Sequence, residues 1–306
     1  MNRKRIVITG AAGGVIGRIL PRLRELYDLV LLDMFDTDQG GRPIEGIHKV
    51  DLINPNRDEY RQFFRGADMV IHAAYTFSLR INNDGISSNI NPEAGNQRFK
   101  RASDDIQMTH NIYRMALEEN IKRVIVFSSN HATDYYEHLI RKGVLETVTE
   151  DMVPYSDNLY GWTKICGEAL GHIFAEGNES GEKALEVIAI RFGAPREDLI
   201  ENVTSKDYYH IRRHFASYLS ADDELQLIKL CIETEDIRDE NGVPFLMFYG
   251  TSDNYNRIWS LRNARHALGY EPKDSSYSDF SERITGLFNE NIKQETEHRK
   301  GKKGGN

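Results

Sequence analysis

The chain has 306 residues, of which 40% are hydrophobic and 28% are charged, and its formal net charge is −8 at pH 7. This balance is typical of globular proteins, and an acidic chain is poorly suited to nucleic-acid phosphates, which bind clustered Lys and Arg. We therefore expect no nucleic-acid partner. No apolar stretch approaches the roughly 20 residues of a membrane span, so we expect no membrane partner either.

The cysteines and the two ends of the chain suggest little chemistry. Cys166 and Cys231 lie far apart and form no CxxC spacing, so neither a disulfide framework nor a metal site is expected. The apolar run near the amino terminus breaks at Gly10, too early for a secretory signal, and a cytoplasmic location is therefore expected. The Lys- and Gly-rich segment 291–306 is expected to be disordered.

Residues 1–195 alternate short β-branched apolar runs with longer amphipathic segments. Apolar runs predict parallel strands buried on both faces, and the segments between them predict helical crossovers. The predicted strands are Arg5–Thr9, Leu29–Asp33, Lys49–Leu52, Met69–Ala74, Arg123–Ser128 and Glu186–Phe192. The predicted helices lie near Gly14–Tyr27, Arg57–Arg65, Ser103–Asn120 and Asn158–Glu176. The expected fold is α/β, a doubly wound Rossmann-type parallel sheet.

Two features depart from this regular alternation. Pro21 lies inside the first predicted helix, where proline removes a backbone hydrogen bond and should kink the chain. Beyond residue 195 a polar stretch precedes three further predicted elements, the helix Ala221–Thr234, the strand Pro244–Tyr249 and the helix Leu261–Leu268. We expect residues 1–195 to form a nucleotide-binding domain and residues 196–290 to form a small substrate-binding lobe over the carboxyl edge of the sheet.

The first predicted strand runs directly into a glycine-rich turn, Thr9 to Gly17, which opens the first predicted helix. Glycines let the backbone turn tightly and approach a pyrophosphate, and the helix offers unpaired N–H groups and its positive dipole end. A dinucleotide-binding fingerprint requires this position between strand and helix. The turn therefore predicts a nucleotide site.

Asp33 ends the second predicted strand, roughly 20 residues beyond the glycines. A carboxylate in that position accepts the hydrogen bonds of an adenosine ribose and repels the additional phosphate of NADP. No arginine follows it directly, so the expected cofactor is NAD.

Tyr160 and Lys164 are four residues apart in a predicted helix, which places the phenol and the ammonium on one face. Tyrosine alone is a poor base at neutral pH, but a fixed positive charge stabilises the phenolate. In the helix after the fifth strand of a nucleotide-binding sheet, this pair predicts a catalytic base and a ribose-binding lysine. Ser129 follows that fifth strand, where its hydroxyl can hold a substrate hydroxyl or carbonyl against Tyr160.

These motifs, in this order, resemble the extended short-chain dehydrogenase/reductase family, the NAD-dependent epimerase/dehydratase group. The resemblance covers residues 1–195 and implies a catalytic triad of Ser129, Tyr160 and Lys164. It also implies a set of cofactor-binding residues: Gly10, Gly13, Gly14, Ile16, Gly17, Asp33, Asp51, Leu52, Ala73, Ala74 and Lys164. The glycine turn is one residue longer than the usual Gly-x-x-Gly-x-x-Gly, which leaves the part of each glycine open. Asp105 stands where the family often has asparagine, so a fourth supporting catalytic residue is not carried over.

The segment Ser129-Asn130-His131 and the stretch that begins at Arg213 resemble the uronate dehydrogenase branch of that family. The dehydratases carry an Asp-Glu pair where this chain has Asn130-His131. The resemblance implies that Asn130 and His131 bind sugar hydroxyls and that Arg213 holds a substrate carboxylate in its planar fork. Ala194 departs from the branch, which has a substrate-binding serine there, and insertions at 75–101 and 194–212 border the expected substrate cleft.

We therefore expect an NAD-dependent oxidoreductase that oxidises C1 of a cyclic sugar to a lactone, with Tyr160 as the base. A hexuronate is the first expected substrate and a neutral aldose the second. Two alternatives stay open, an NDP-sugar 4-epimerase that retains NAD and a non-catalytic NAD-binding regulator. By analogy with the family, the chain is expected to form a homodimer through the helices near 103–120 and 158–176.

Overall fold

The computed structural model describes residues 3–76, 92–178, 181, 183–204, 208–287 and 289–290. Within these ranges a seven-stranded sheet has the strand order β3-β2-β1-β4-β5-β6-β7, and every neighbouring pair is parallel. The strands are β1 (Arg5–Thr9), β2 (Asp28–Asp33), β3 (Ile47–Lys49), β4 (Met69–His72), β5 (Arg123–Ser129), β6 (Glu186–Phe192) and β7 (Phe245–Gly250). The strand order reverses between β1 and β4, the switch point beyond which ligands bind in doubly wound sheets. The predicted fold class is confirmed.

Two apolar layers cover the sheet, because successive side chains of a strand point to opposite faces. Ile6 and Ile8 of β1 face one layer, whereas Val7 faces the other. The helices that pack on the first face are α1 (Gly14–Gly17), α2 (Leu20–Leu26), α8 (Ala221–Glu233) and α9 (Arg262–Leu268). On the second face lie α3 (Pro92–Glu118), α5 (Leu159–Glu176) and the short 3₁₀ helices η1 (Arg57–Glu59) and η2 (Arg61–Phe63).

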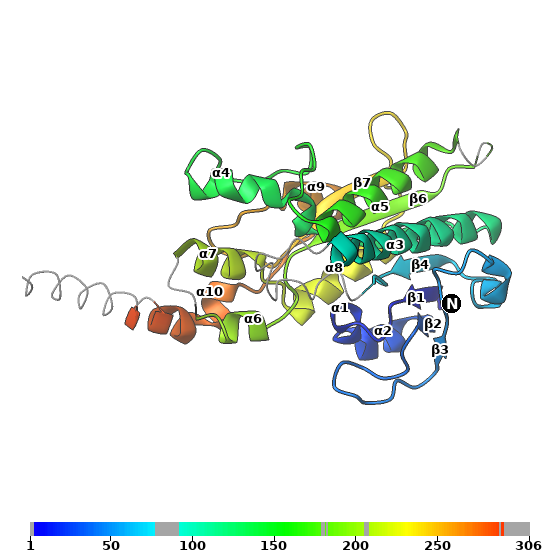
Figure 1. The fold of residues 1–306 in the computed structure, drawn as a ribbon, viewed down its shortest axis with the longest axis horizontal. Helices are drawn as coiled ribbons and strands as arrows, with labels where there is room; N and C mark the ends of the chain where they lie inside the picture. Colours follow the sequence, from blue (N-terminus) through cyan, green and yellow to red (C-terminus); the bar gives the residue numbers. More distant parts are fainter. Residues whose placement is uncertain are drawn as a thin grey trace, which may run out of the picture.

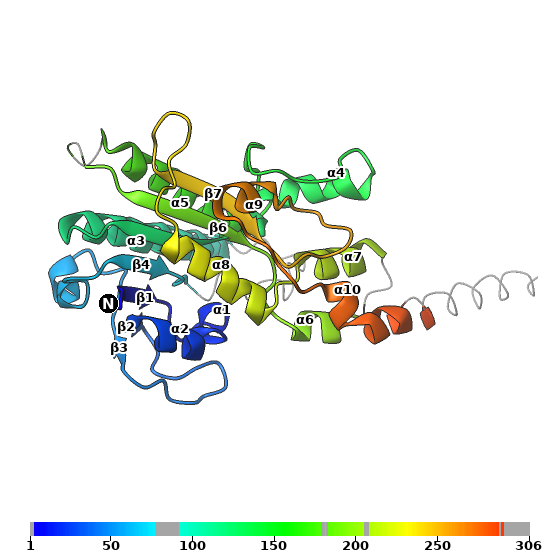
Figure 2. The same ribbon diagram turned by 180° about the vertical axis from the view of Figure 1, so that it is seen from behind.

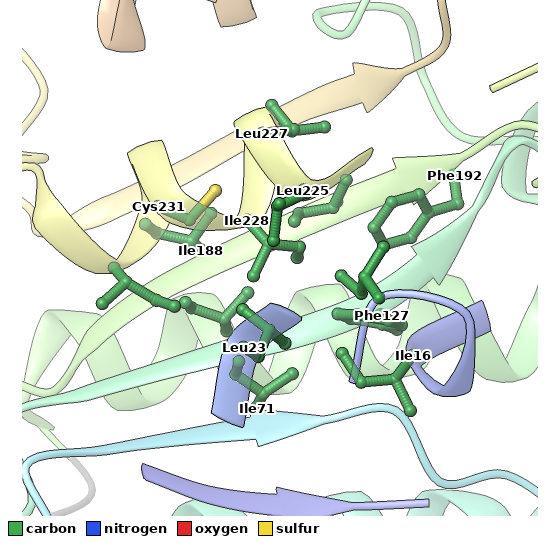
Figure 3. Packing of buried hydrophobic residues seen from close by; sticks show 14 of the residues in the cluster. Ile16, Leu23, Ile71, Phe127, Ile188, Phe192, Leu225, Leu227, Ile228 and Cys231 are labelled. Carbon is green, nitrogen blue, oxygen red and sulfur yellow. The ribbon is translucent and has the colours of Figure 1, made fainter. Parts of the chain in front are cut away.

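Helix α8 belongs to the core of the first face. Figure 3 shows Ile228 and Cys231 of α8 beside Ile188 of β6, with Ile16 of α1 next to Phe127 of β5. All five side chains are at most 6% exposed, and burying each such side chain stabilises the fold by roughly 1.5–3 kcal/mol. The glycine turn is thus anchored to the middle of the sheet through Ile16.

Short helices gather beyond the carboxyl ends of the strands. They are the 3₁₀ helix η5 (Asn130–Tyr136), α4 (Glu137–Arg141), α6 (Asp198–Glu201), α7 (Tyr208–Ser217) and α10 (Ser276–Asp279). Figures 1 and 2 show α4, α6, α7 and α10 together at the end of the molecule opposite the amino terminus. This cluster of helices faces the edge at which the switch point opens.

Several predicted boundaries are wrong. The helix predicted for residues 14–27 is two helices, and Pro21 lies in the first turn of α2, where its missing N–H has no intrahelical acceptor to lose. The segment 57–65 forms two 3₁₀ turns rather than an α-helix. The strands predicted to reach Leu52 and Ala74 end at Lys49 and His72, so the residues beyond them lie in loops at the carboxyl edge.

The carboxyl-terminal part of the chain is joined closely to the sheet. Strand β7, predicted within the small lobe, pairs with β6 over six register positions and forms the edge of the main sheet. Helix α3 begins at Pro92 and so includes the end of the predicted insertion 75–101, of which residues 77–91 lie outside the described ranges. The predicted disordered tail, 291–306, also lies outside them. No helix in the described part of the chain is long and apolar enough to cross a membrane.

Candidate active site

The glycine turn has the geometry of a dinucleotide-binding loop. Gly10 has φ +73°, and a Cβ placed on it would lie 2.4 Å from the backbone nitrogen of Ala74, so a larger residue does not fit. Gly13 is the N-cap of α1, and its N–H donates to the Gly10 carbonyl at 2.9 Å. Within this described turn no side chain caps α1, so the first N–H groups of the helix are available to an anionic ligand.

The other members of the lengthened turn have different surroundings. Gly14 lies against Gln39, whose Oε1 would be 3.0 Å from an added Cβ, whereas nothing lies within 4 Å of such an atom on Gly17. The Ile16 side chain is fully buried, so any contact of this residue with a cofactor would use its backbone. Gly10 and Gly13 are therefore the two positions at which the turn depends on glycine and on an open backbone.

Asp33, at the end of β2, faces the same turn. Its Oδ2 accepts the N–H of Ala12 at 3.0 Å, and its Oδ1 accepts the N–H of Phe35 at 3.1 Å. Each carboxylate oxygen keeps a further lone pair with which it can accept a ribose hydroxyl. The fixed negative charge suits the ribose of NAD and opposes a 2′-phosphate.

Asp51 and Leu52 lie in the loop that follows β3. The exposed Asp51 accepts the N–H of Ile53 at 3.0 Å, and Leu52 is 3% exposed. Asn111 of α3 donates from Nδ2 to the carbonyls of Leu52 at 2.9 Å and Asn54 at 3.2 Å. Asn111 thus fixes the loop after β3 to helix α3. Asn111 is fully buried, and an amide among the apolar positions of a predicted helix is the sequence signal that could have identified this residue.

His72 joins β1 to β4 at the switch point. Its Nδ1 lies 2.7 Å from Thr9 Oγ1 and its Nε2 lies 3.2 Å from Thr109 Oγ1. Burial, together with the positive charge of Lys164, lowers the pKa of His72 to about 3, so the ring is neutral. The chain then continues with the Ala73 N–H donating to the Thr9 carbonyl at 3.0 Å, which places Ala73 and the next alanine beside the glycine turn.

Tyr160 and Lys164 lie together in the first two turns of α5. The Lys164 Nζ is 5.6 Å from the ring centroid of Tyr160 and 5.6 Å from that of Tyr75. The rings of Tyr75 and Tyr160 meet edge to face at 5.9 Å. The predicted juxtaposition of phenol and ammonium is present, and Tyr75, directly after the Ala-Ala pair, is an additional member of the site that the sequence did not suggest.

The start of α5 packs directly on the segment that follows β5. Asn158 caps α5 by accepting the Gly161 N–H at 2.8 Å. A Cβ on Gly161 would lie 2.1 Å from the His131 carbonyl oxygen, so this approach requires glycine. The His131 ring consequently meets the Tyr160 ring edge to face at 5.5 Å.

Ser129 and Asn130 lie at the buried end of β5, with 4% and 3% exposure. Ser129 Oγ accepts the His131 N–H at 3.3 Å and lies 3.3 Å from Asn130 Oδ1. Together with the packing of His131 on Tyr160, these contacts place the predicted Ser129, His131 and Tyr160 at one edge of the sheet.

Arg213 of α7 also reaches this edge, but its guanidinium is paired with the protein. Its Nε donates to Glu137 Oε1 at 2.7 Å and Oε2 at 2.8 Å, and its Nη2 lies 3.6 Å from Asp134 Oδ1. Asp134 Oδ2 in turn contacts His131 Nδ1 at 2.6 Å. Burial raises the pKa of Glu137 and Arg213 opposes that rise. The sequence did not identify Glu137 or Asp134, although the three-residue spacing from His131 to Asp134 was visible.

Glu168 lies on the same face of α5 as Tyr160 and Lys164, one turn beyond Lys164. Its Oε1 accepts from Ser128 Oγ at 2.5 Å and from Arg191 Nε at 2.8 Å, and its Oε2 accepts from Arg191 Nη2 at 2.8 Å. Arg191 Nη1 donates to the Tyr249 hydroxyl at 3.0 Å, which lies 3.1 Å from Thr133 Oγ1. Thr133 belongs to η5, so this buried network of hydrogen bonds links η5 to α5 and β6.

Asp105, the departure from the family pattern, holds the chain after β4. Its Oδ1 accepts the Thr76 N–H at 3.0 Å, and the Thr76 hydroxyl donates to the Arg101 carbonyl at 3.2 Å. The side chain is 3% exposed. Asp105 therefore positions the segment that carries Tyr75. Across the described ranges, no group of three or more His, Cys, Asp or Glu side chains could hold a metal ion.

The sheet topology, the glycine turn with Asp33, and the Tyr160/Lys164 pair define a Rossmann-type dinucleotide-dependent oxidoreductase. Residues 6–196 match the NAD dependent epimerase/dehydratase family. The chain therefore belongs to that family, and it is an NAD-dependent oxidoreductase of the extended short-chain dehydrogenase type.

Individual relatives agree with this assignment. The chain is 29% identical to L-arabinose 1-dehydrogenase (NAD(P)(+)) of Haloferax volcanii, over 89% of this chain and 97% of that protein. It is 27% identical to uronate dehydrogenase of Pseudomonas putida, over 89% of this chain and 85% of the relative. A crystal structure of a uronate dehydrogenase mutant from Agrobacterium tumefaciens, complexed with NAD, has the same fold, with a TM-score of 0.65 and 22% identity over 93% of this chain and 89% of that one.

Proposed function

We propose that this protein oxidises C1 of a cyclic sugar to a lactone, with Tyr160 as the general base. The observation that carries the proposal is the meeting of Tyr160, Lys164 and His131 at the carboxyl edge of the sheet, next to the loop that suits NAD. Bound NAD supplies the acceptor for the hydride that leaves C1. The relatives that are named as L-arabinose 1-dehydrogenase and uronate dehydrogenase support a sugar substrate.

Each residue of the proposed catalytic set has a defined part. The Tyr160 phenolate accepts the proton of the anomeric hydroxyl, which lets the C1–O bond become a carbonyl as C1 loses its hydrogen with the bonding electrons. The Lys164 ammonium stabilises that phenolate and donates to the nicotinamide ribose. Ser129 holds the reacting oxygen against Tyr160, and Asn130 and His131 bind neighbouring sugar hydroxyls.

The cofactor half of the site is proposed to consist of backbone and carboxylate groups. The glycine turn, represented by Gly10, Gly13, Gly14, Ile16 and Gly17, receives the pyrophosphate through N–H groups. Asp33 accepts from the adenosine ribose, Asp51 and Leu52 border the adenine, and Ala73 and Ala74 line the cofactor through their backbone.

The proposed assembly is a homodimer through α3 and α5. Phe99 of α3 and Trp162 of α5 are 55% and 37% exposed and stack on each other with ring centroids 5.9 Å apart. Large exposed aromatic pairs favour burial in an interface. Sedimentation velocity of the protein should show a dimer, and Trp162→Glu should shift it to monomer; a monomeric parent protein would refute the assembly.

We also propose the cytoplasmic location expected from the amino-terminal segment, which the free thiols of Cys166 and Cys231 support. We also propose a division into a domain of residues 1–195 and a lobe of residues 196–290, in which β7 and α8 of the carboxyl-terminal part complete the sheet and its core. In that division, α7 brings Arg213 to the substrate side of the site.

The test combines a substrate panel with a matched pair of variants. NAD is mixed with free aldoses, hexuronates and UDP-sugars, and NADH is followed by absorbance. Tyr160→Phe should lower kcat about a hundredfold or more, as expected when a general base is removed. Tyr255→Phe, at a tyrosine that is 69% exposed, should leave kcat unchanged. Silence with free sugars, together with interconversion of UDP-sugars, would favour the epimerase and refute the proposal.

A further inference from the structure

The ion-pair cluster around Arg213 bears directly on the charge of the substrate. The guanidinium is bracketed on its Nε edge by both oxygens of Glu137, at 2.7 and 2.8 Å, and Asp134 Oδ1 lies 3.6 Å from Nη2. One face of the guanidinium lies 5.9 Å from the ring centroid of Trp259, which is 1% exposed. Two carboxylates and a buried indole thus surround a single positive charge.

The two carboxylates are held where they are. Asp134 Oδ2 contacts His131 Nδ1 at 2.6 Å and accepts from Asn158 Nδ2 at 2.8 Å. Glu137 is the first residue of α4, and its Oε2 accepts from the Tyr209 hydroxyl at 3.5 Å. The side chains of Asp134 and Glu137 are only 9% and 16% exposed, so neither can turn into solvent without losing these contacts.

The cluster adjoins the reacting end of the site. His131 contacts Asp134 through Nδ1 and packs its ring edge to face against Tyr160 at 5.5 Å. A chain of contacts thus leads from Tyr160 through His131 and Asp134 to Arg213, and a sugar with its anomeric hydroxyl at Tyr160 would have these groups beside it. Among the described side chains, the Arg213 cluster itself pairs one guanidinium with two carboxylates, so this cluster offers no surplus positive charge to an anion.

We propose that Glu137, supported by Asp134, is a specificity-determining residue that occupies the position of a substrate carboxylate on Arg213, so that the site accepts uncharged aldoses and rejects uronates and sugar phosphates. This inference rests on the proposed oxidation of free sugars. Arg213 then offers its remaining Nη N–H groups to sugar hydroxyls, while Glu137 and Asp134 accept from them. A uronate must instead bring a third carboxylate to a cluster that already holds two, and like charges at such close range oppose binding.

The test compares matched neutral and acidic sugars. We expect kcat/KM to be about tenfold or more higher for D-glucose than for D-glucuronate, and for D-galactose than for D-galacturonate. Glu137→Gln keeps the shape of the side chain and removes its charge. It should reduce this preference about tenfold, mainly by lowering KM for the uronate. Glu146→Gln removes the same charge from an exposed side chain and should leave the preference unchanged.

Each outcome decides the matter. A wild-type protein that prefers uronates, or a preference that Glu137→Gln leaves unaltered, overturns the inference while the proposed sugar oxidation stands. No NADH from any free sugar refutes the proposed function and this inference with it. If circular dichroism shows that Glu137→Gln does not fold, Asp134→Asn is used in its place, and it should reduce the preference for neutral sugars in the same way. The inhibition constant of D-glucuronate against the best neutral aldose, in the unaltered protein, gives an independent readout and should lie at least about tenfold above the KM of that aldose.

Discussion

The substitution Arg191→Met tests the buried network that supports the catalytic edge. Arg191 is fully buried, and Glu168 is 5% exposed. Two charge-assisted hydrogen bonds at 2.8 Å join them, and Ser128 adds a third at 2.5 Å to the same carboxylate. Burial alone would lower the pKa of Arg191, but Glu168 more than offsets this and the pKa is raised, so the guanidinium stays charged.

Removing the arginine leaves a buried carboxylate without its counter-charge. Breaking a buried ion pair in this way costs about 3–5 kcal/mol. For a protein of this size, with about 2–4 °C of Tm lost per kcal/mol, the thermal midpoint should fall by on the order of 10 °C. The measurement is thermal unfolding followed by circular dichroism at neutral pH.

The matched control is the double variant Arg191→Met with Glu168→Met. Replacing both charges with apolar side chains of similar length should recover most of the lost stability, because no unpaired charge remains. A single variant that loses less than about 1 kcal/mol, or a double variant less stable than Arg191→Met alone, would show that the ion pair does not stabilise the buried network beneath η5 as we argue.

Three further predictions concern the cofactor edge. Asp33→Asn should raise KM for NAD about tenfold and narrow the discrimination against NADP, measured by steady-state kinetics with both cofactors, because a hydrogen bond to a charged acceptor is lost. Gly10→Ala should destabilise the protein by about 2 kcal/mol or more, because Gly10 has φ +73° and a backbone atom would lie 2.4 Å from the new Cβ. The control Gly17→Ala, whose Cβ would meet nothing within 4 Å, should change the free energy of unfolding by under about 1 kcal/mol. Both variants are measured by urea titration. His72 stays neutral in the folded protein down to about pH 3, whereas in the unfolded chain it binds a proton below pH 6.5. The contribution of neutral His72 to the free energy of unfolding is therefore present above pH 6.5 and is lost as the pH falls toward about 3. His72→Asn should make the free energy of unfolding decline less steeply across that range, by about 1.4 kcal/mol per pH unit.

Local signals in the sequence were sufficient for most of the sheet. Strands β1 and β6 begin and end at the predicted residues, since continuous apolar runs bounded by polar residues leave little freedom. The placement of β7 was not visible, because which strand pairs at the edge of a sheet is decided by tertiary packing. The break between α1 and α2 is likewise not evident from the sequence, because a proline is compatible both with a kink inside one helix and with the first turn of a second helix.

The site divides in the same way. The four-residue spacing of Tyr160 and Lys164 predicted their contact, because it depends only on helical geometry. The pairing of Arg213 with Glu137 joins side chains 76 residues apart, and no periodicity in the sequence indicates it. Only the resemblance to uronate dehydrogenases indicates that Arg213 binds a substrate carboxylate. In the structure Glu137 occupies the Nε edge of Arg213, and we therefore propose neutral sugars as substrates.

The origin of the hydrogen transferred to NAD shows whether C1 of the sugar is the carbon that is oxidised. The best neutral aldose is prepared with deuterium at C1 and incubated with the protein and NAD. We predict that the deuterium appears in the reduced nicotinamide, seen by mass spectrometry, and that the sugar product is a lactone without deuterium. Tyr160→Phe should slow this transfer about a hundredfold or more. Deuterium that remains on the sugar while the protein turns over would contradict oxidation at C1.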